Sequence, residues 1–388
     1  MRILTLSTLF PTVHRPNFGV FVECQTRALA EVRDFAVTVV NPIGTAPWPL
    51  SLWAGQSDLR SLRDESWCGL EVFRPPFTAI PVLGGARNPA AIFRATLPLV
   101  EQLHRETPFD LIDAEFFFPD GPAAMRLSHA LDIPFTIKAR GADIHHWGQQ
   151  RACASQILMA ADKAAGLLAV SEALKTDMIA MGIDAAKIQV HYTGLDQNRF
   201  VPADRAAAKA RLGLVGPVLL SVGALIPRKG QTMLLQALLA IPDATLLLVG
   251  VGPDEATLRA QATALGVGDR VKFLGAIPHD DLPNLYQAAD IMALASSSEG
   301  LANAWVEALA CGTPVIASDV GGIRELLKND TAGRIVARTP KAIAEAARDI
   351  LANPPTQADV AENVQTLSWG ENAGQLAEFF RSVAGRQG

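Results

Sequence analysis

The sequence has few cysteines, and it has none of the cysteine or histidine spacings that are typical of a zinc site. Its four cysteines, Cys24, Cys68, Cys153 and Cys311, are widely separated along 388 residues. A structural zinc site needs closely spaced pairs of ligands, so none is expected. Isolated cysteines are typical of buried free thiols in a reducing compartment, which predicts a cytoplasmic protein.

The chain also lacks a strong charge of either sign and a long apolar run. Its 34 Lys and Arg residues against 39 Asp and Glu residues give a formal net charge of −5, which argues against nucleic acid as a partner. No uncharged apolar stretch reaches the ~18 residues that a membrane-spanning helix needs. The N-terminal residues imitate a short signal peptide, but they lack a small-residue cleavage site and lead into Pro11. We therefore expect a buried first strand there.

Hydrophobic residues, in contrast, are abundant: they make up 49% of the chain against 19% charged residues, which excludes disorder and a coiled coil. Short apolar runs alternate with helical stretches, and many runs are apolar on both faces, as in parallel strands that helices cover on both sides. Strands are predicted at residues 3–7, 37–41, 111–114, 135–138, 167–170, 188–191, 218–222, 245–249, 271–274, 291–295, 315–318 and 334–336. The sequence therefore predicts an α/β fold with two doubly wound parallel sheets.

A charged segment with prolines and glycines near residues 195–215 separates the two halves of this pattern. We expect Rossmann-like domains at residues 1–198 and 199–367, followed by an amphipathic helix within residues 368–388. Ligands of such sheets bind beyond the carboxyl ends of the strands, in the cleft between two tandem sheets, so the loops after strands should carry the chemistry.

The most informative loop is SSSEGLANAWVEALACGTPVIASDVGG, residues 296–322. It places Glu299 between a strand and a helix, and Glu307 about two turns into that helix. Gly300 allows a ligand to approach the backbone, and the amides of Leu301, Ala302 and Asn303 at the helix start are donors suited to phosphate or a sugar hydroxyl. A carboxylate such as Glu307 can accept hydrogen bonds from a ribose diol. Two solvated glutamates would be the alternative.

This segment resembles the Glu-x7-Glu signature of the retaining glycosyltransferases of family 4, which have the GT-B fold, and the similarity extends over nearly the whole chain. The resemblance implies two Rossmann-like domains that face a cleft and a C-terminal helix that packs back on the N-terminal domain. It also implies that Glu299 contacts the donor sugar, that Glu307 contacts the nucleotide ribose, and that the amides of residues 301–303 bind sugar hydroxyl and phosphate.

A second element, SVGALIPRKGQ, ends a strand at Gly223 and places Arg228 and Lys229 before a helix. Two cations at this point can bind an anion, although a solvated surface pair would have the same sequence. By resemblance they hold the leaving diphosphate, which is electrostatic work that other enzymes give to a metal. No Asp-x-Asp occurs in the chain, so we expect neither a metal nor another cofactor.

Further donor contacts are implied at three loops. Gly250 and Gly252 follow a strand in LLLVGVGPD, where the resemblance implies a nucleotide pocket and an ordinary strand-to-helix turn is the alternative. Gly275, Ala276 and Ile277 resemble the segment that meets the base through backbone groups. Backbone contacts do not distinguish the bases in the sequence, so the expected donor is either a UDP- or a GDP-sugar. Gly19 resembles the family's glycine at the start of the first helix, where an ordinary helix-entry glycine is the alternative.

The acceptor side is implied by segments of the N-terminal half. ARGADIHH resembles the family's His-Gly-x-Asp motif, which many members place at the catalytic centre, with Arg140 in the place of the histidine and Asp143 in the place of the aspartate. The resemblance therefore implies that Arg140 and Asp143 are catalytic residues. Arg140 replaces a neutral hydrogen-bonding group by a permanent cation, which could hold a donor phosphate or an acidic acceptor. Asp120, in PDG, and His145 and His146 are weaker candidates on the acceptor side.

The resemblance as a whole implies a metal-independent, retaining hexosyltransferase that uses a nucleotide-sugar donor. The segments resemble most those of bacterial enzymes that extend lipid-linked cell-surface polysaccharides, with an acceptor at the inner face of the cytoplasmic membrane. Residues 48–63 carry tryptophan and arginine and suit either a peripheral membrane contact or an ordinary packed loop. The alternatives are a nucleotide-sugar 2-epimerase and a non-catalytic subunit that binds sugar nucleotides.

Overall fold

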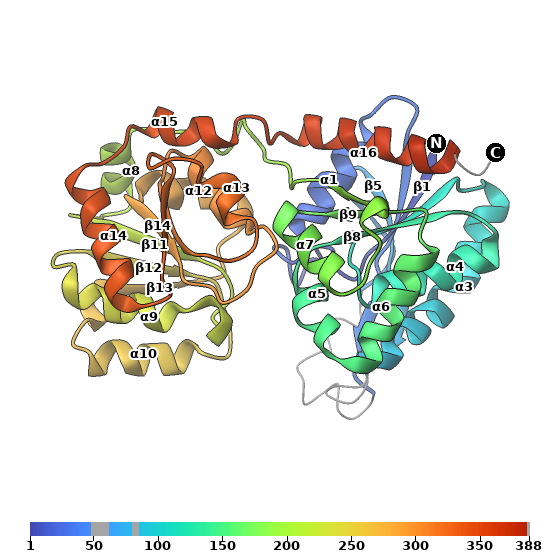
Figure 1. The fold of residues 1–388 in the computed structure, drawn as a ribbon, viewed down its shortest axis with the longest axis horizontal. Coiled ribbons are helices and arrows are strands. Elements are labelled where there is room, and N and C mark those ends of the chain that lie inside the picture. Colours follow the sequence, from blue (N-terminus) through green and yellow to red (C-terminus); the bar gives the residue numbers. More distant parts are fainter. Residues whose placement is uncertain (48–61, 80–84, 386–388) are drawn as a thin grey trace. The chain divides into compact units, whose positions relative to one another are not determined.

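The computed structural model describes residues 1–47, 62–79 and 85–385, which fold into two units (Figure 1). Unit 1 comprises Met1–Gly194 and Trp369–Gly388, and unit 2 comprises Leu195–Ser368. The expected boundaries were 198/199 and 367/368. Residues 195–198 go with unit 2 because Leu195 forms a β-bridge with Ser368 and Gln197 donates a hydrogen bond to the carbonyl of Gln365.

Unit 1 is built on a sheet of eight strands in the order β10-β9-β8-β7-β1-β2-β5-β4, parallel except for the β4–β5 hairpin. In chain order the strands are β1 (Arg2–Leu6), β2 (Ala36–Val40), β4 (Glu65–Trp67), β5 (Leu70–Phe73), β7 (Leu111–Ala114), β8 (Phe135–Ala139), β9 (Gly166–Ala169) and β10 (Ile188–Val190). A separate parallel pair joins β3 (Ile43–Thr45) to β6 (Pro76–Thr78). The central strands are buried on both faces, as the apolar runs predicted.

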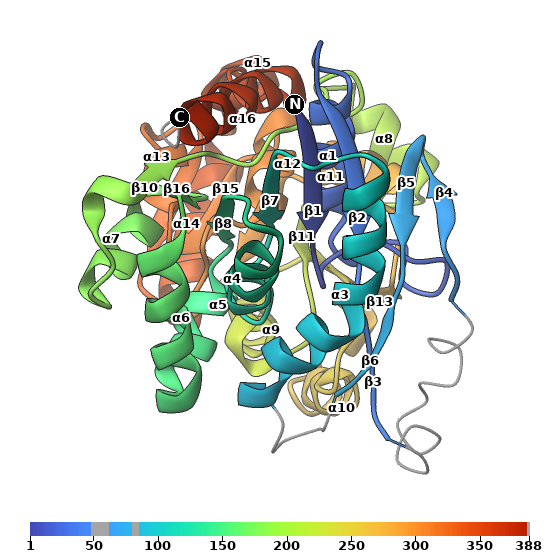
Figure 2. The ribbon, with the colours of Figure 1, turned by 90° about the vertical axis from the view of Figure 1, so that its right-hand side faces the viewer.

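Helices cover both faces of this sheet (Figure 2). They are α1 (Val20–Ala30), α3 (Asn88–Glu106), α4 (Asp120–Leu131), α5 (Ala142–His145), α6 (Arg151–Lys163), α7 (Glu172–Ala180) and α16 (Trp369–Ala384). A Cβ on Gly166 of β9 would meet Phe379 of α16, whereas a Cβ on Gly121 of α4 would meet Ile137 of β8. Because Ile137 and Gly166 occupy alternate positions on paired strands, α16 and α4 lie on opposite faces.

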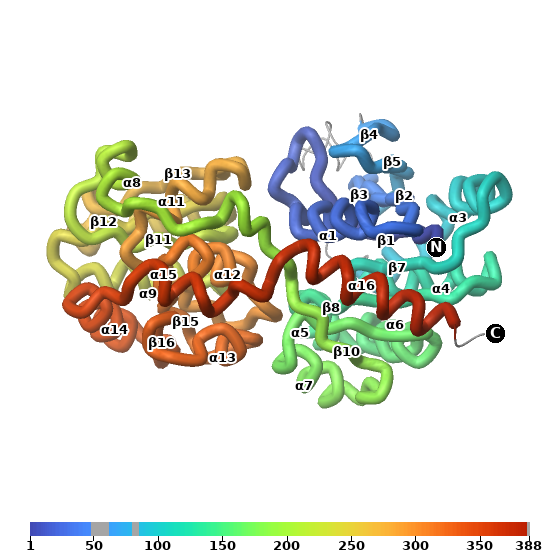
Figure 3. The backbone as a smooth tube through the Cα atoms, turned by 90° about the horizontal axis from the view of Figure 1, so that it is seen from above, coloured from blue at the N-terminus to red at the C-terminus, as the bar shows by residue number. Residues whose placement is uncertain are grey.

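The C-terminal helix α16 packs on unit 1, as expected (Figure 3). Its apolar stripe, which includes Leu376, Phe379 and Phe380, is buried together with Ile3 of β1 and Leu29 of α1. A hydrogen bond of 2.9 Å between His191 Nε2 and the carbonyl of Asn372 adds a polar contact at the end of β10. The last element of the chain therefore completes the core of unit 1.

Unit 2 is built on six parallel strands in the order β13-β12-β11-β14-β15-β16. They are β11 (Val218–Val222), β12 (Thr245–Val249), β13 (Val271–Gly275), β14 (Ile291–Leu294), β15 (Val315–Ser318) and β16 (Gly333–Val336). One face packs on α9 (Gln231–Ala237), α10 (Glu255–Ala264) and α14 (Pro340–Ala352). The remaining helices are α8 (Arg205–Arg211), α11 (Leu282–Ala288), α12 (Asn303–Ala310), α13 (Ile323–Leu326) and α15 (Gln357–Ala361).

The strand order of unit 2 places its chemically interesting loops together. β11, β12, β13 and β14 are neighbours and run parallel, so their carboxyl ends lie along one edge of the sheet. That edge carries Gly223, Gly250, Gly275 and the segment that leads to Glu299. The fold thus brings four of the predicted donor-binding loops to one place.

Candidate functional site

Glu299 lies in the loop between β14 and α12, and it is held by cations and by its own loop. Its residue is 8% exposed. Oε1 accepts hydrogen bonds from Lys229 Nζ at 2.5 Å and from Ser296 Oγ at 2.7 Å, and Oε2 lies 3.4 Å from Arg228 Nη1. Three donors thus surround one carboxylate, which fixes its orientation.

Arg228 and Lys229 belong to a short 3₁₀ turn, Pro227–Lys229, after β11. The two side chains differ in exposure: 38% for Arg228 and 13% for Lys229. Arg228 also donates to the carbonyl of Ser298, and its own carbonyl accepts from the amide of Ser297 at 2.8 Å. The two loops are therefore joined, and two cations against one carboxylate leave a surplus of positive charge.

Two residues that the sequence analysis missed complete this arrangement. Arg338 donates from Nε to the carbonyl of Ala295 at 2.8 Å and from Nη2 to that of Pro227 at 3.2 Å, so it also bridges both loops. A Cβ on Gly321, at φ +53°, would lie 2.5 Å from the carbonyl oxygens of both Glu299 and Gly300. Gly321 is part of the motif DVGG, and the pair of glycines in this motif is the sequence feature from which its role could have been predicted.

Glu307 lies on α12 and is 8% exposed. His279 Nε2 lies 2.9 Å from Oε1, and the Tyr286 hydroxyl donates to Oε2 at 2.8 Å. Burial raises the pKa of Tyr286 well above its usual value, with a further contribution from the charge of Glu307, so the phenol stays protonated. Neither partner was predicted, because both precede Glu307 by more than twenty residues and meet it only in the folded chain.

The helix α12 begins at Asn303, two residues later than expected. Leu301 and Ala302 are buried in the approach to the helix, and the carbonyl of Gly300 accepts from the amide of Gly322 at 2.8 Å. The loop from Glu299 to α12 is therefore fixed by its contact with the glycines after β15. Amides of the first helical turn point out of the helix end, where a phosphate or hydroxyl oxygen can accept from them.

The glycines predicted to shape the nucleotide pocket have a structural role of their own. A Cβ on Gly250 would lie 2.1 Å from the carbonyl oxygen of Gly223, and one on Gly252 would lie 2.2 Å from that of Leu225. These positions need glycine because neighbouring strand-end loops approach each other closely. Gly275, at φ +67°, has open space around its Cβ position, and Ala276 and Ile277 follow it after β13.

In unit 1, Arg140 and Asp143 follow β8 and are held by protein groups. Arg140 Nη2 forms an ion pair with Glu115, and Nε donates to the Glu115 carbonyl at 3.3 Å, while Nη1 is buried without a partner among the described residues. Asp143 is completely buried and accepts from the amides of Gly141 at 2.7 Å and Phe117 at 2.8 Å. Burial raises its pKa despite these amides.

A buried polar network extends behind Arg140. Lys138, 0% exposed, lies 2.6 Å from Gln25 Oε1 and 2.7 Å from His191 Nδ1. Burial lowers the pKa values of both Lys138 and His191 well below their usual ranges. Burial also raises the pKa of Asp113, which hydrogen-bonds Thr136 on the same sheet. From the sequence, Lys138, His191, Asp113 and Thr136 were predicted only as strand positions, and Gln25 only as part of a helix.

The remaining candidates of unit 1 have varied surroundings. Asp120 is fully buried at the start of α4, its Oδ2 accepts from the amide of Thr8 at 2.8 Å, and burial raises its pKa to about 8. Gly19, at φ +74°, lies so close to the first loop that a Cβ would be 2.4 Å from the carbonyl carbon of Leu9. His145 lies 2.8 Å from Asp177 of α7, and His146 lies 3.3 Å from Gln150.

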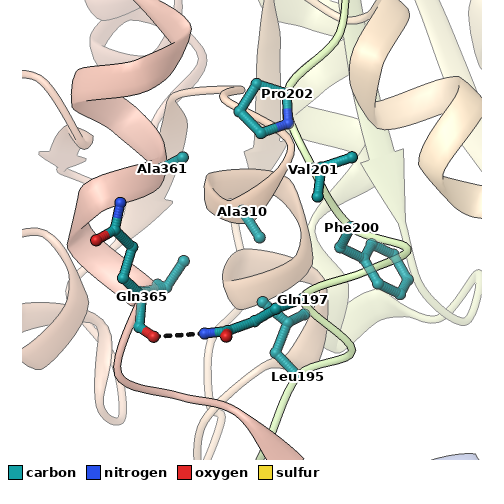
Figure 4. Close-up of a pocket in the computed structure, with 9 residues that line it drawn as sticks. Leu195, Gln197, Phe200, Val201, Pro202, Ala310, Ala361 and Gln365 are labelled. Carbon is teal, nitrogen blue, oxygen red and sulfur yellow. Dashed lines mark hydrogen bonds between the residues drawn. The ribbon is translucent and has the colours of Figure 1, made fainter.

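A pocket of about 350 Å³ within unit 2 was not predicted (Figure 4). It lies beside the last turn of α12, between the segment after Gly194 and the segment after α15. Its lining residues are Leu195, Gln197, Phe200, Val201, Pro202, Ala310, Ala361, Val364 and Gln365. None of the predicted site residues lines it, but Phe200 also contacts the rings of His279 and Tyr286.

The described part of the chain has neither a cluster of metal-ligating side chains nor a helix that could span a membrane. No group of three or more His, Cys, Asp or Glu side chains in residues 1–47, 62–79 and 85–385 is placed to hold a metal ion. No described helix is both long enough and apolar enough to cross a membrane. Metal independence stays a prediction. Contact of residues 48–63 with a membrane also stays a prediction, because residues 48–61 lie outside the described residues.

Comparison with known proteins identifies the class of enzyme. Residues 204–367 match the model of the glycosyl transferases group 1, and residues 19–199 match that of Glycosyltransferase Family 4. A Bacillus subtilis glycosyltransferase assigned to teichuronic acid biosynthesis is 29% identical, and the alignment covers 99% of each chain.

Solved structures with the same fold include glycosyltransferases. Sucrose-phosphate synthase from Thermosynechococcus elongatus has a TM-score of 0.82 at 24% identity and covers 99% of both chains. Anabaena HepE in complex with UDP has a TM-score of 0.75 at 25% identity, covering 98% of this chain and 100% of that one. The chain therefore belongs to the group 1 glycosyltransferases and has the GT-B fold.

Proposed function

We propose that this glycosyltransferase moves a sugar from a nucleotide-sugar donor to an acceptor hydroxyl with retention of the anomeric configuration and without a metal ion. The observation that carries the proposal is the arrangement of Lys229, Arg228 and Glu299 at the edge of the unit 2 sheet. Its surplus positive charge suits a diphosphate, and its fixed carboxylate suits sugar hydroxyls. The complexes of Anabaena HepE with UDP and UDP-glucose support a nucleotide-sugar donor.

In the proposed step, the bond between the anomeric carbon and the diphosphate oxygen breaks, and the acceptor oxygen bonds to the same face of that carbon. The acceptor proton passes to the departing diphosphate oxygen. Negative charge grows on the diphosphate as the bond breaks, so Arg228 and Lys229 stabilise the transition state more than the bound donor. Glu299 orients the sugar, and Glu307 binds the ribose.

The proposed acceptor is a lipid-linked oligosaccharide of a cell-surface polysaccharide. The relative from Bacillus subtilis supports this choice, because its name places it in the synthesis of such a polymer. We assign acceptor contacts to unit 1, where Arg140 follows the carboxyl end of β8. The proposed site of action is the cytoplasm, at the inner face of the cytoplasmic membrane.

A panel of UDP- and GDP-sugars tests the reaction class. The full chain, treated with EDTA, is incubated with each donor, and the products are analysed by chromatography and by NMR of the anomeric proton. We expect the enzyme to release nucleoside diphosphate from one donor slowly in water and faster when a lipid-linked acceptor is present. The new linkage should have the same anomeric configuration as the donor sugar. A changed sugar on an intact nucleotide would indicate an epimerase, and no turnover with any donor and acceptor would indicate a non-catalytic subunit. A strict need for added Mg²⁺ or Mn²⁺ would contradict metal independence.

A further inference from the structure

Glu307 is oriented from two directions by elements that precede it in the chain. His279 lies in the 3₁₀ turn His279–Asp281 after β13, and Tyr286 lies on α11. Each contacts a different oxygen of the carboxylate: His279 Nε2 lies 2.9 Å from Oε1, and the Tyr286 hydroxyl lies 2.8 Å from Oε2. A carboxylate can accept about four hydrogen bonds, so two acceptor directions remain for a ligand.

The two donors are themselves held in place by packing. Tyr286 is 0% exposed and Phe200 is 2% exposed. The ring of Phe200 lies 5.2 Å from that of His279 and 6.2 Å from that of Tyr286, measured between centroids. The side chain of Glu307 keeps 11% exposure. The carboxylate is thus fixed on its inner side and still accessible to a ligand.

We propose that His279 and Tyr286 are positioning residues that aim the Glu307 carboxylate at the donor ribose and so make the site prefer a ribonucleotide over a 2′-deoxyribonucleotide. This inference rests on the proposed nucleotide-sugar function. A carboxylate with one fixed orientation accepts from both hydroxyls of a ribose, whereas a freely rotating one loses entropy on binding and gains less from the second hydroxyl. Neither residue touches the ligand in this account.

The surrounding charges keep both donors in a donating state. Arg199 and Asp280, which form an ion pair with each other, also act on His279. Burial lowers the pKa of His279, but the hydrogen bond and charge of Glu307 outweigh this and raise it. Tyr286 stays protonated, as described above, and Cys311 behind Glu307 also has a raised pKa because of burial and the same charge.

The test measures the ratio of affinities for a ribonucleoside diphosphate and its 2′-deoxy form. Calorimetry is run on the full chain with UDP and 2′-deoxy-UDP, and with the guanosine and adenosine pairs. The variants are Glu307→Gln, Tyr286→Phe, His279→Leu and His279→Gln, whose amide can reach the place of Nε2. Tyr192→Phe, the other tyrosine of the chain, and the exposed His129→Leu are matched controls in unit 1.

We expect the wild type to prefer the ribonucleotide by about tenfold, the scale of one hydrogen bond to a charged group. Glu307→Gln should bring the ratio close to one. Tyr286→Phe and His279→Leu should each lower it by about threefold or more with little change for the deoxy form, whereas His279→Gln and both controls should keep it. A variant that fails to unfold cooperatively is set aside. If Tyr286→Phe is set aside, the positioning role is judged from His279: the affinity ratio should fall in His279→Leu and be kept in His279→Gln.

The outcomes separate this inference from the function on which it rests. Wild-type ratios in both Tyr286→Phe and His279→Leu, with the ratio lost in Glu307→Gln, would overturn the positioning role and leave the proposed function intact. An unchanged ratio in Glu307→Gln would overturn both the inference and the ribose assignment. A wild-type chain that binds none of the nucleotides would contradict the proposed donor itself.

Discussion

Lys229 and Arg228 differ in a way that their adjacent positions in the sequence conceal. Both were predicted to bind diphosphate, with a solvated pair as the alternative. Lys229 is nearly buried against Glu299, whereas Arg228 keeps 38% exposure and hydrogen-bonds a carbonyl. Removal of Lys229 leaves a buried carboxylate with one cation fewer, which costs folding free energy as well as catalysis.

Lys229→Ala should therefore lower both the unfolding free energy and turnover, whereas Arg228→Ala should lower turnover alone. The expected stability loss for Lys229→Ala is about 2 kcal/mol, the scale of a lost hydrogen bond to a charged group. Both variants should lose about two decades in kcat. Denaturant unfolding and steady-state kinetics measure these effects. Adding Glu299→Gln to Lys229→Ala should restore stability but not turnover, and equal stability of the two single variants would contradict the buried pair.

Asp120 gives a prediction of pH dependence. Its folded pKa of about 8 lies above the value of an unfolded aspartate, so its contribution to stability is present at low pH. That contribution is lost as pH rises between ~4 and about 8, because the unfolded carboxyl ionises first. The asparagine side chain in Asp120→Asn cannot ionise, so this variant does not lose that contribution. The difference between its unfolding free energy and that of the wild type should therefore shift in favour of the variant as the pH rises. Denaturant unfolding at pH 5, 7 and 8.5 measures the difference, and a constant difference would show that Asp120 is ionised throughout.

Elements show most clearly what the sequence could predict. Six of the eight strands of the unit 1 sheet and all six strands of the unit 2 sheet were predicted, because their short apolar runs are uninterrupted. The candidate residues between β14 and α12 could be identified because they are contiguous in the sequence. The hairpin of β4 and β5 was missed: it turns at Cys68 and Gly69, both with positive φ, within a stretch rich in tryptophan and proline that resembles a loop. Arg338, His279 and Gln25 were missed because each acquires its role from a partner far along the chain.

Gly321 tests how the loop after β15 supports Glu299. Gly321→Ala introduces a Cβ into the carbonyl oxygens of Glu299 and Gly300, so it should displace the Glu299 loop and lower kcat at least tenfold. Gly266→Ala is the matched control: its φ of +69° gives similar backbone strain, but nothing lies within 4 Å of its Cβ position. Kinetics of the two variants measure the effect. Similar kcat values would mean that the contact with Gly321 does not hold the loop.

Helix α16 tests the assembly of unit 1. Phe380→Ala empties a site of 0% exposure between α16 and the sheet, and it should lower the unfolding free energy by about 3–5 kcal/mol. Phe18→Ala, at a residue 43% exposed, should change it little. Thermal unfolding measures both. Because Phe380 belongs to unit 1, Phe380→Ala should leave nucleotide affinity unchanged at temperatures below its unfolding transition. A loss of nucleotide affinity without a loss of stability would contradict the division of the chain into these units.

At the scale of the whole molecule, the chain combines two sheets whose polar sites differ in kind. Unit 2 has cations and carboxylates along one sheet edge with glycines that let its loops approach closely. Unit 1 has a buried network in which the charges of Arg140 and Lys138 are both offset by the carboxylate of Glu115. Burial raises the pKa of Glu115, but Arg140 and Lys138 outweigh burial and lower it. Residues 204–367 match the glycosyl transferases group 1 model and residues 19–199 match the Glycosyltransferase Family 4 model, so each unit is similar to a glycosyltransferase domain.

The most direct test of the account is a calorimetric titration of the full chain with nucleoside diphosphate, comparing the wild type with Glu307→Ala and Glu299→Ala. Glu307→Ala should weaken binding about tenfold, because it removes the acceptor for the ribose. Glu299→Ala should bind the diphosphate at least as tightly as the wild type, because it releases Lys229 and Arg228 from their carboxylate, while turnover falls. Equal losses of affinity in the two variants would contradict the assignment of ribose to Glu307 and sugar to Glu299.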